Sequence, residues 1–189
     1  MILLEKETEV YLIDNGSRTL VPISAVINSN VIIHPRAKLG KNIEFYPEVN
    51  IGKGVIIGDN TTFGRNNKIG AFSKIGSNVH FLANVTIGNN VTIDDDVIIG
   101  CDCYIFDNCI IESGSKIGCG SILAYGVKIR KDVNVIGMFN VFGRFAEVCA
   151  GSIIYHRQEI KSLQKVPCLS RIGEPNDEFI DLAELIPKF

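Results

Sequence analysis

The stretch FLANVT-IGNNVT-IDDDVI-IGCDCY-IFDNCI-IESGSK-IGCGSI (residues 81–122) carries an apolar residue at the first position of every group of six. The same pattern runs without a miss from residue 27 to residue 141 and gives twenty such groups, called hexads below. A helix repeats its buried face about every 3.6 residues and a simple strand every two, so neither explains a period of six. A period of six is typical of β-helix architectures. The apolar positions, denoted i, are Ile27, Ile33, Leu39, Phe45, Ile51, Ile57, Phe63, Ile69, Ile75, Phe81, Ile87, Ile93, Ile99, Ile105, Ile111, Ile117, Leu123, Ile129, Val135 and Val141.

The residues that follow position i explain how so short a unit can close. Position i+3 is Asn, Asp or Gly in fifteen of the twenty hexads, and these residues tolerate the positive φ of a tight turn. Position i+4 is mostly small or β-branched, which suits a second inward residue at a cramped corner. Each hexad is therefore predicted to be a short strand and a corner, so three hexads close one triangular coil of eighteen residues.

Twenty hexads predict nearly seven coils, stacked as parallel strands about 4.8 Å apart with the aliphatic side chains inside. Side chains at i−1 and i+1 are expected to point outward. The period itself does not fix the handedness of the winding, although general rules favour right-handed crossovers.

The flanks of the repeat predict two further parts. EVYLIDNGSRTLVPI (residues 9–23) alternates around Asp14-Asn15-Gly16, a strong hairpin turn signal. NDEFIDLAELI (residues 176–186) offers Asn176 as a helix N-cap before an apolar stripe. We therefore expect a hairpin cap over 1–26, a β-helix over 27–147 and a tail over 148–189. The tail would hold one helix near 177–186 and another from Gln158 to Gln164.

The composition of the chain argues against some classes of function. The chain has 189 residues, enough for one domain with a substantial core, and its net charge of −2 gives no support to binding of nucleic acid or of an anionic membrane. No secretory signal or membrane-spanning run is apparent, so we expect a cytoplasmic protein. In that compartment the six cysteines are expected to be thiols.

The recurring pentapeptides IGKGV (51–55), IGAFS (69–73), IGSNV (75–79), IGNNV (87–91) and IGCGS (117–121) resemble the hexapeptide-repeat acyltransferases. The resemblance covers about two thirds of the chain and implies an all-β fold, a left-handed parallel β-helix. It further implies homotrimers with active sites in the grooves between neighbouring prisms, and acetyl-CoA as acyl donor.

The end of the repeat is similar to the stretches that close the family's prism, through IGCGSIL (117–123), RKDV (130–133) and NVFGRFAEV (140–148). By this resemblance, Lys131 would approach the CoA phosphates. Residues 144–147 depart from the family's Asn-Pro-Ala-Lys, and no loop interrupts the hexads, so an acceptor site would lie on flat faces, at the termini or against a neighbouring subunit. The residues implied to line the pantetheine through backbone groups are Gly118, Cys119, Gly120 and Ser121.

His80 is the candidate catalytic base. It stands at an outward i−1 position in the fourth coil, and an imidazole with a pKa near neutrality can take a proton from an attacking hydroxyl or amine. Lys116 stacks two coils further along, about 10 Å away, and Arg130 and Lys131 lie beyond it, where they would meet the phosphates of an extended acyl-CoA. The alternatives are an ordinary surface histidine and catalysis by the substrate's own groups.

The candidate acceptor-binding residues are Asn78, Asn84 and Asp95. A carboxylate in the run 94–96 could orient an imidazole or hold an amino sugar, while the alternative is a solvated turn. His34, His80 and His156 lack the spacing of a three-histidine zinc site, so we expect no metal.

The cysteines divide by position in the hexad. Cys103 and Cys109 fall at inward i+4 positions and are expected in the core. Cys101 and Cys119 are eighteen residues apart and should stack at one corner, as a metal pair or a redox pair.

An apolar patch is expected on one outer face, formed by Tyr104, Phe106, Ile122 and Phe142. Such a patch indicates a partner, which we interpret as a second copy of the chain, with the C-terminal helix as the alternative cover.

The sequence thus predicts a CoA-dependent acyltransferase, most simply an acetyltransferase, acting on a hydroxyl or amine of a sugar or nucleotide-sugar in a groove between subunits. The alternative is a non-catalytic scaffold or assembly subunit. Acceptor identity, acyl length and O- versus N-transfer stay open.

Overall fold

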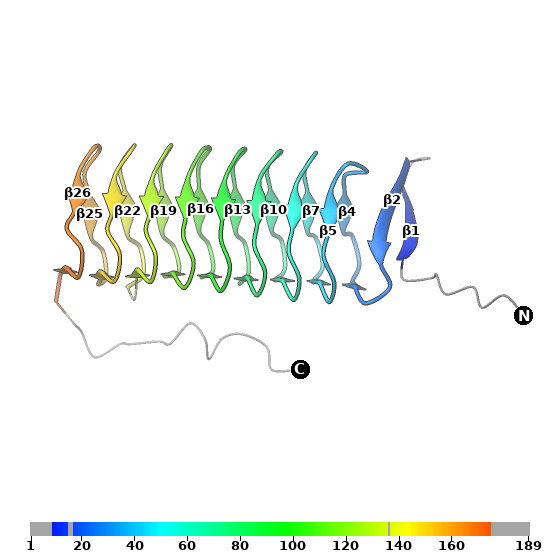
Figure 1. Ribbon diagram of the computed structural model, residues 1–189, viewed down its shortest axis with the longest axis horizontal. Coiled ribbons are helices and arrows are strands. Elements are labelled where there is room, and N and C mark those ends of the chain that lie inside the picture. The colour runs from blue at the N-terminus through cyan, green and yellow to red at the C-terminus, as the bar shows by residue number, and fades with distance from the viewer. Residues whose placement is uncertain (1–8, 15–16, 136, 175–189) are drawn as a thin grey trace, which may run out of the picture.

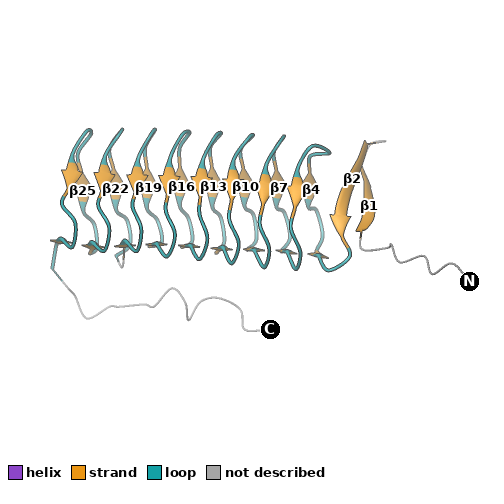
Figure 2. Ribbon diagram, in the orientation of Figure 1, coloured by secondary structure: helices purple, strands orange, loops and turns teal. Residues whose placement is uncertain are grey.

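The protein is a long prism of stacked coils with a hairpin at its N-terminal end (Figure 1). The computed structural model describes residues 9–14, 17–135 and 137–174. Within these ranges every regular element is a strand, so none of the described segments is a helix able to cross a membrane (Figure 2). Three parallel sheets of eight, eight and nine strands form about eight coils. The predicted all-β parallel β-helix is confirmed, with one coil more than expected.

Each sheet is one face of the prism. Face 1 contains β3 (Val26–Ile27), β6 (Glu44–Phe45), β9 (Thr62–Phe63), β12 (His80–Phe81), β15 (Ile98–Ile99), β18 (Lys116–Ile117), β21 (Asn134–Val135), β24 (Ile153–Ile154) and β27 (Arg171–Ile172). Face 2 contains β4 (Ile32–Ile33), β7 (Asn50–Ile51), β10 (Lys68–Ile69), β13 (Thr86–Ile87), β16 (Tyr104–Ile105), β19 (Ile122–Leu123), β22 (Val141–Phe142) and β25 (Glu159–Ile160). Face 3 contains β5 (Lys38–Leu39), β8 (Ile56–Ile57), β11 (Lys74–Ile75), β14 (Thr92–Ile93), β17 (Ile110–Ile111), β20 (Lys128–Ile129), β23 (Glu147–Val148) and β26 (Lys165–Val166).

The N-terminal hairpin pairs β1 (Glu9–Asp14) with β2 (Ser17–Pro22) in antiparallel register, from Glu9 opposite Pro22 to Asp14 opposite Ser17. These strands are the ones that the turn signal predicts. The hairpin lies beyond the first coil, and β2 contacts β5 (Figure 1). It therefore sits where a cap over the first coil is expected.

The core consists of the inward positions i and i+4, which are buried along the prism. Three phenylalanines of face 1 stack inside it, with ring centroids 5.1 Å apart for Phe45 and Phe63 and 4.8 Å apart for Phe63 and Phe81. Their rings are nearly parallel because the coils repeat with one spacing, so aromatic packing reinforces that spacing.

The turn prediction is confirmed at nearly every hexad, because the residue at i+3 has a positive φ from Asn30 to Asp132 with the exception of Arg36. Some corners place a large side chain there: Phe72 has a φ of 60°. Its ring lies against Gly54 at the equivalent corner one coil earlier, where an added Cβ would come within 2.8 Å of it. Glycine below such a ring is therefore needed for space as well as for its φ of 68°.

The register shifts by one residue after β21. Ile122 pairs with Val141, nineteen residues on, whereas earlier partners are eighteen residues apart. Consequently Phe142 is fully buried and Val141 is 41% exposed. The predictions that Val141 points inward and that Phe142 belongs to an outer patch are wrong, because one extra residue in the corner turns the next strand over.

The solenoid also continues past the expected boundary at residue 147. After the extra residue the six-residue pattern resumes at Val148, Ile154, Ile160, Val166 and Ile172, which are the inward residues of β23 to β27. The helix expected from Gln158 to Gln164 is wrong, because β25 occupies this stretch. The helix expected near 177–186 lies outside the described residues.

Two cysteines differ from the expectation of free thiols. Cys149 and Cys168 form a disulfide between successive coils, with their Cα atoms 4.4 Å apart. Cys103 and Cys109 are buried thiols, as predicted, and burial raises the pKa of Cys103 to about 12 and that of Cys109 to about 11. Stacking thus brings cysteines of neighbouring coils within bonding distance.

The register shift can be tested by comparing Phe142→Ala with Val141→Ala. Removing the buried Phe142 ring leaves a cavity and should lower the free energy of unfolding by about 3–5 kcal/mol. Trimming the exposed Val141 should change it by less than about 1 kcal/mol. Denaturant unfolding of both variants measures the difference, and the reverse order would restore an unbroken period of six through residue 141.

Candidate functional site

His80 lies on the outer side of face 1, in β12. Its neighbours in register are Thr62 in β9 and Ile98 in β15, and Ile98 is followed by Lys116 in β18. The expected column from His80 to Lys116 is therefore present.

The His80 imidazole is half-buried, and its Nδ1 atom is buried without a hydrogen-bond partner among the described residues. Burial lowers the pKa of His80 below the ordinary 6.5, because it disfavours the charged ring, while Glu44 two coils earlier acts in the opposite direction. The neutral imidazole, which can accept a proton, therefore predominates near neutral pH.

A pocket of about 300 Å³ lies beside His80 on the same face. Thr62 contributes to it from the strand paired with β12, and Leu82 contributes two residues after His80. The lining is almost entirely apolar, so the pocket suits a hydrocarbon or an aromatic group. The lining residues are Tyr46, Thr62, Gly64, Phe81, Leu82, Ala83 and Cys101.

The pocket is formed by the i+1 residues of three successive coils on face 1. Tyr46 and Leu82 carry large side chains, and Gly64 stands between them without one. An added Cβ at Gly64 would come within 2.7 Å of the Leu82 carbonyl oxygen. Sequence reasoning missed this pocket, although a glycine flanked eighteen residues away on both sides by bulky outward residues is a detectable signal.

A small apolar cluster continues from the pocket toward the C-terminal coils. Leu82 and Ile98 are both buried although they stand on the outer side of the sheet, and Cys101 and Cys119 pack against them. The outer side of face 1 is thus partly desolvated next to His80.

The candidate acceptor residue Asn78 precedes His80 at the corner between faces 3 and 1. Its amide donates to Asp96 at 3.0 Å and accepts from Asn60 at 3.2 Å. Asp95, at the same corner, accepts a hydrogen bond of 2.7 Å from the backbone N–H of Ser77. Both side chains therefore take part in ladders that join one coil to the next.

Asn84 lies at the other end of β12, at the corner between faces 1 and 2. It accepts from Asn66 at 3.1 Å and donates to Asp102 at 2.9 Å. Asn78 and Asn84 thus flank His80 from opposite corners, and the structure does not bring the three acceptor candidates together.

The stretch 118–121 is covered by the following coil. Gly118 is buried against the backbone of Gly137, and Gly120 lies under the Phe139 ring. The Cys119 sulfur accepts a hydrogen bond from the backbone N–H of Cys101, and the Ser121 side chain is fully buried. Gly118 and Ser121 are therefore buried while Cys119 and Gly120 are partly exposed, and the pantetheine contacts that the family resemblance implies for this stretch stay a prediction.

The cations differ in availability. Arg130 is held on face 3 by ion pairs of 2.7 Å to Glu112 and 2.6 Å to Glu147, and the hydrogen bonds that it donates to these carboxylates raise the pKa of Arg130. Lys131 is exposed at the corner between faces 3 and 1. The ion pairs of Arg130 with Glu112 and Glu147, called the Arg130 clamp below, reach the coils on both sides. They therefore join neighbouring coils, as the asparagine ladders do.

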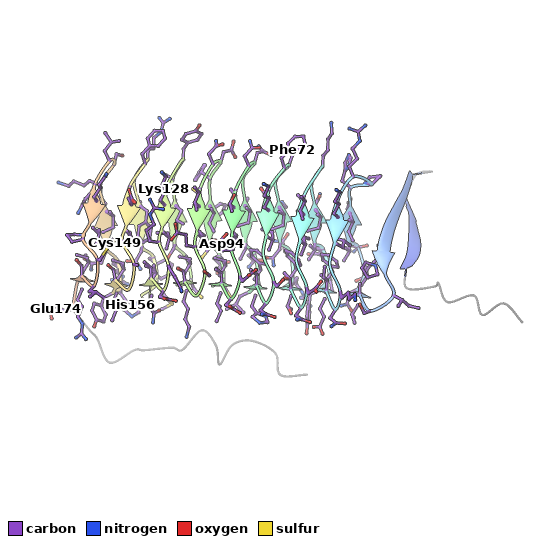
Figure 3. All side chains as sticks on the ribbon, in the orientation of Figure 1. Phe72, Asp94, Lys128, Cys149, His156 and Glu174 are labelled. Carbon is purple, nitrogen blue, oxygen red and sulfur yellow. A yellow bond between two sulfur atoms is a disulfide. The ribbon has the colours of Figure 1, made fainter. Side chains whose placement is uncertain are left out.

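Figure 3 shows outward side chains along the whole prism, with Asp94, Lys128 and His156 among those labelled. Asp94 follows β14 on face 3, so it lies on a different face from His80. Burial raises the pKa of Asp94, and Glu112 and Asp95 add to the effect. In the described ranges no three His, Cys, Asp or Glu side chains gather as a metal site would require.

Comparison of the sequence with family models and with curated proteins finds no match. Among solved structures, the UDP-N-acetylglucosamine O-acyltransferase (LpxA) from Moraxella catarrhalis RH4 is similar, with 24% sequence identity and a TM-score of 0.65 over 73% of this chain. LpxA from Bacteroides fragilis 9343, a UDP-N-acetylglucosamine acyltransferase, has 21% identity and a TM-score of 0.51, with 79% of this chain and 71% of that chain covered.

The chain spans 63% of the Moraxella protein, and at these identities the likeness concerns the fold. Both neighbours are acyltransferases by name, in agreement with the resemblance of the pentapeptides. The chain has the β-solenoid fold of the hexapeptide-repeat enzymes.

Proposed function

We propose that the protein is an acyltransferase that moves an acyl group from a CoA thioester to a hydroxyl or amine of a sugar or nucleotide-sugar. The observation that carries the proposal is His80, an imidazole kept neutral by burial beside an apolar pocket on the outside of the solenoid. A base next to an apolar hollow suits a reaction in which a polar acceptor attacks an acyl group.

In the proposed reaction the acceptor oxygen or nitrogen attacks the thioester carbonyl while His80 takes its proton. The carbon–sulfur bond then breaks, and the thiolate of CoA leaves, receiving a proton from the imidazolium or from water. The pocket beside His80 would receive the acyl group, for which acetyl is the smallest case. Because apolar walls keep water away, they would favour transfer to the acceptor over hydrolysis.

The CoA portion would run from His80 toward the C-terminal coils. Lys116 lies two coils along in the same column, about 10 Å away, and Lys131 is exposed at the adjoining corner. Arg130 is left out of this proposal, because Glu112 and Glu147 already occupy its guanidinium.

The proposed assembly is a homotrimer, with a second copy of the chain on face 2. Tyr104, Ile122 and Val141 follow one another in register there and are 36% to 52% exposed, and Phe106 extends the same apolar patch. At the neighbouring corner, Tyr125 and Phe145 form an edge-to-face pair with centroids 5.3 Å apart.

A flat apolar face and an aromatic corner on the same coils can meet between two copies placed side by side. Because one copy would offer its face and the next its corner, the contact is head-to-tail, and such contacts form a ring when the rotation between copies closes, as it would in the proposed trimer. A contiguous apolar surface of this kind is uncommon on monomers, which supports an oligomer.

The role of His80 is tested with His80→Gln, in an assay of CoA release from acetyl-CoA and longer acyl-CoAs with a panel of sugars and nucleotide-sugars. Loss of the base should lower kcat by about 100- to 10,000-fold. Because burial lowers the pKa of His80, wild-type kcat/KM should fall on acidification with a midpoint below 6.5. Turnover of the variant near the wild-type rate would remove His80 as the base, and absence of CoA release by the wild type would favour a scaffold subunit.

The pocket is tested with Ala83→Leu, which adds a side chain to its wall. Filling the hollow should lower kcat/KM for acyl transfer by about tenfold or more, because the acyl group loses its apolar contacts. The matched control is Ala71→Leu, at the same hexad position on the corner between faces 2 and 3, and it should leave kcat/KM unchanged. Equal effects of the two substitutions would argue against the pocket as the acyl site.

The interface is tested by the double substitution Tyr104→Lys and Ile122→Lys, measured by sedimentation. The wild type should have three times the mass of the chain, and the double variant the mass of one chain, because buried unpaired charges oppose association. Ile56→Lys on face 3 is the control, since Ile56 is 43% exposed outside the patch. A wild-type monomer would contradict the trimer.

A further inference from the structure

Two thiols that the proposed reaction does not use stand beside the pocket. Cys101 and Cys119 occupy the same corner position after β15 and β18, which are paired in register. Stacked residues of neighbouring coils lie about 4.8 Å apart, within the range of about 4.4–6.8 Å that Cα atoms span across a disulfide. The backbone N–H of Cys101 donates a hydrogen bond of 3.1 Å to the Cys119 sulfur, which therefore lies over the Cys101 backbone.

These two thiols differ from the other two free cysteines. Cys101 and Cys119 are partly exposed, whereas Cys103 and Cys109 are fully buried. The Cys103 thiol donates to the carbonyl of Gly118 at 3.2 Å. Burial raises the pKa of Cys103 to about 12, which lowers its thiolate fraction at neutral pH. Solvent-borne oxidants therefore reach the outer pair first.

The same solenoid already holds one disulfide between coils. Cys149 and Cys168 are bonded across successive coils with a Cα separation of 4.4 Å. A covalent link in the stacking direction is thus compatible with the spacing of this fold.

We propose that Cys101 and Cys119 form a redox modification site, which a low-molecular-weight disulfide such as oxidised glutathione converts into a coil-to-coil disulfide at the wall of the apolar pocket. One thiolate attacks a sulfur of the oxidant, forms a mixed disulfide and releases one reduced thiol. The second cysteine then loses its proton and displaces the other half of the oxidant. The two cysteines lose two electrons and two protons, and the oxidant becomes two thiols.

The bond alters the pocket because Cys101 belongs to its lining. A bond between the two sulfurs fixes the Cys101 side chain toward Cys119, and both cysteines pack against Leu82 and Ile98. Oxidation therefore changes the shape of the site next to His80. Burial raises the pKa of Cys119, which lowers the thiolate fraction of this residue.

To test the proposal, the purified protein is treated with oxidised glutathione, its remaining thiols are blocked, and it is digested with trypsin so that the peptide masses can be measured. Because Lys116 separates the two cysteines, the expected product is peptide 75–116 joined to peptide 117–128 with the loss of two hydrogens, reversed by dithiothreitol. Cys101→Ser and Cys119→Ser should each give a mixed glutathione adduct on the remaining thiol. As matched controls, Cys103→Ser and Cys109→Ser should keep the cross-link. Joining of Cys119 to Cys103 or Cys109, or no cross-link at all, would overturn the proposal.

A second experiment measures binding in the pocket and needs no acyl transfer, so its result does not depend on the proposed function. The Kd of the fluorescent probe anilinonaphthalene sulfonate is measured for reduced and oxidised protein, and Ala83→Leu identifies the signal that comes from the pocket. Oxidation should change that Kd by about fourfold or more, the equivalent of one buried methylene group. Reduction of the cross-linked protein with dithiothreitol should restore the Kd of the reduced form. Equal affinities of the two wild-type forms would contradict an effect on the pocket.

Discussion

The structure depends on backbone hydrogen bonds between one coil and the next. The N–H of His80 bonds to the carbonyl of Val97 in the following coil, and the N–H of Asn78 bonds to the carbonyl of Asp59 in the preceding one. Strands and corners alike thus find their partners about eighteen residues away. Buried backbone groups must be paired, so each coil needs its neighbours on both sides.

This constraint decides what the side chains can do. Coils that lie this close leave no room for a Cβ at Gly118, and they recruit corner side chains such as Asn78 and Asn84 into ladders. At these positions the residues are engaged in stacking between coils. The surfaces left for chemistry are the outward strand positions, and the three faces use these differently. Face 1 carries a base and a hollow, face 2 carries apolar side chains, and face 3 carries the Arg130 clamp.

The sequence predicts what repeats and misses what breaks the repeat. Period and turn residues sufficed for the solenoid, for the corners and for the column from His80 to Lys116, because stacking makes residue number a spatial coordinate. Counting in sixes failed after β21, where one extra residue in a corner places Val141 outward. For the same reason the sequence did not predict the coils after residue 147. The pocket was missed for another reason, since it arises from the sizes of Tyr46, Gly64 and Leu82 in three separate coils. Composition could not pair Cys149 with Cys168, because their separation of nineteen residues is one more than the eighteen-residue stacking of these coils.

The corner after β21 is one residue longer than the other corners, and it takes up this residue without changing the stacking of the coils. Deleting one residue there would return Phe142 to an interval of six from Val135, so the later inward residues would still face the core and only the corner would be rebuilt. The coils on either side therefore share one architecture, and the numbers of their inward residues are offset by one. A shorter or longer relative of this solenoid could gain or lose whole hexads in either segment, and this corner shows that a single added residue can also be absorbed without disturbing the core.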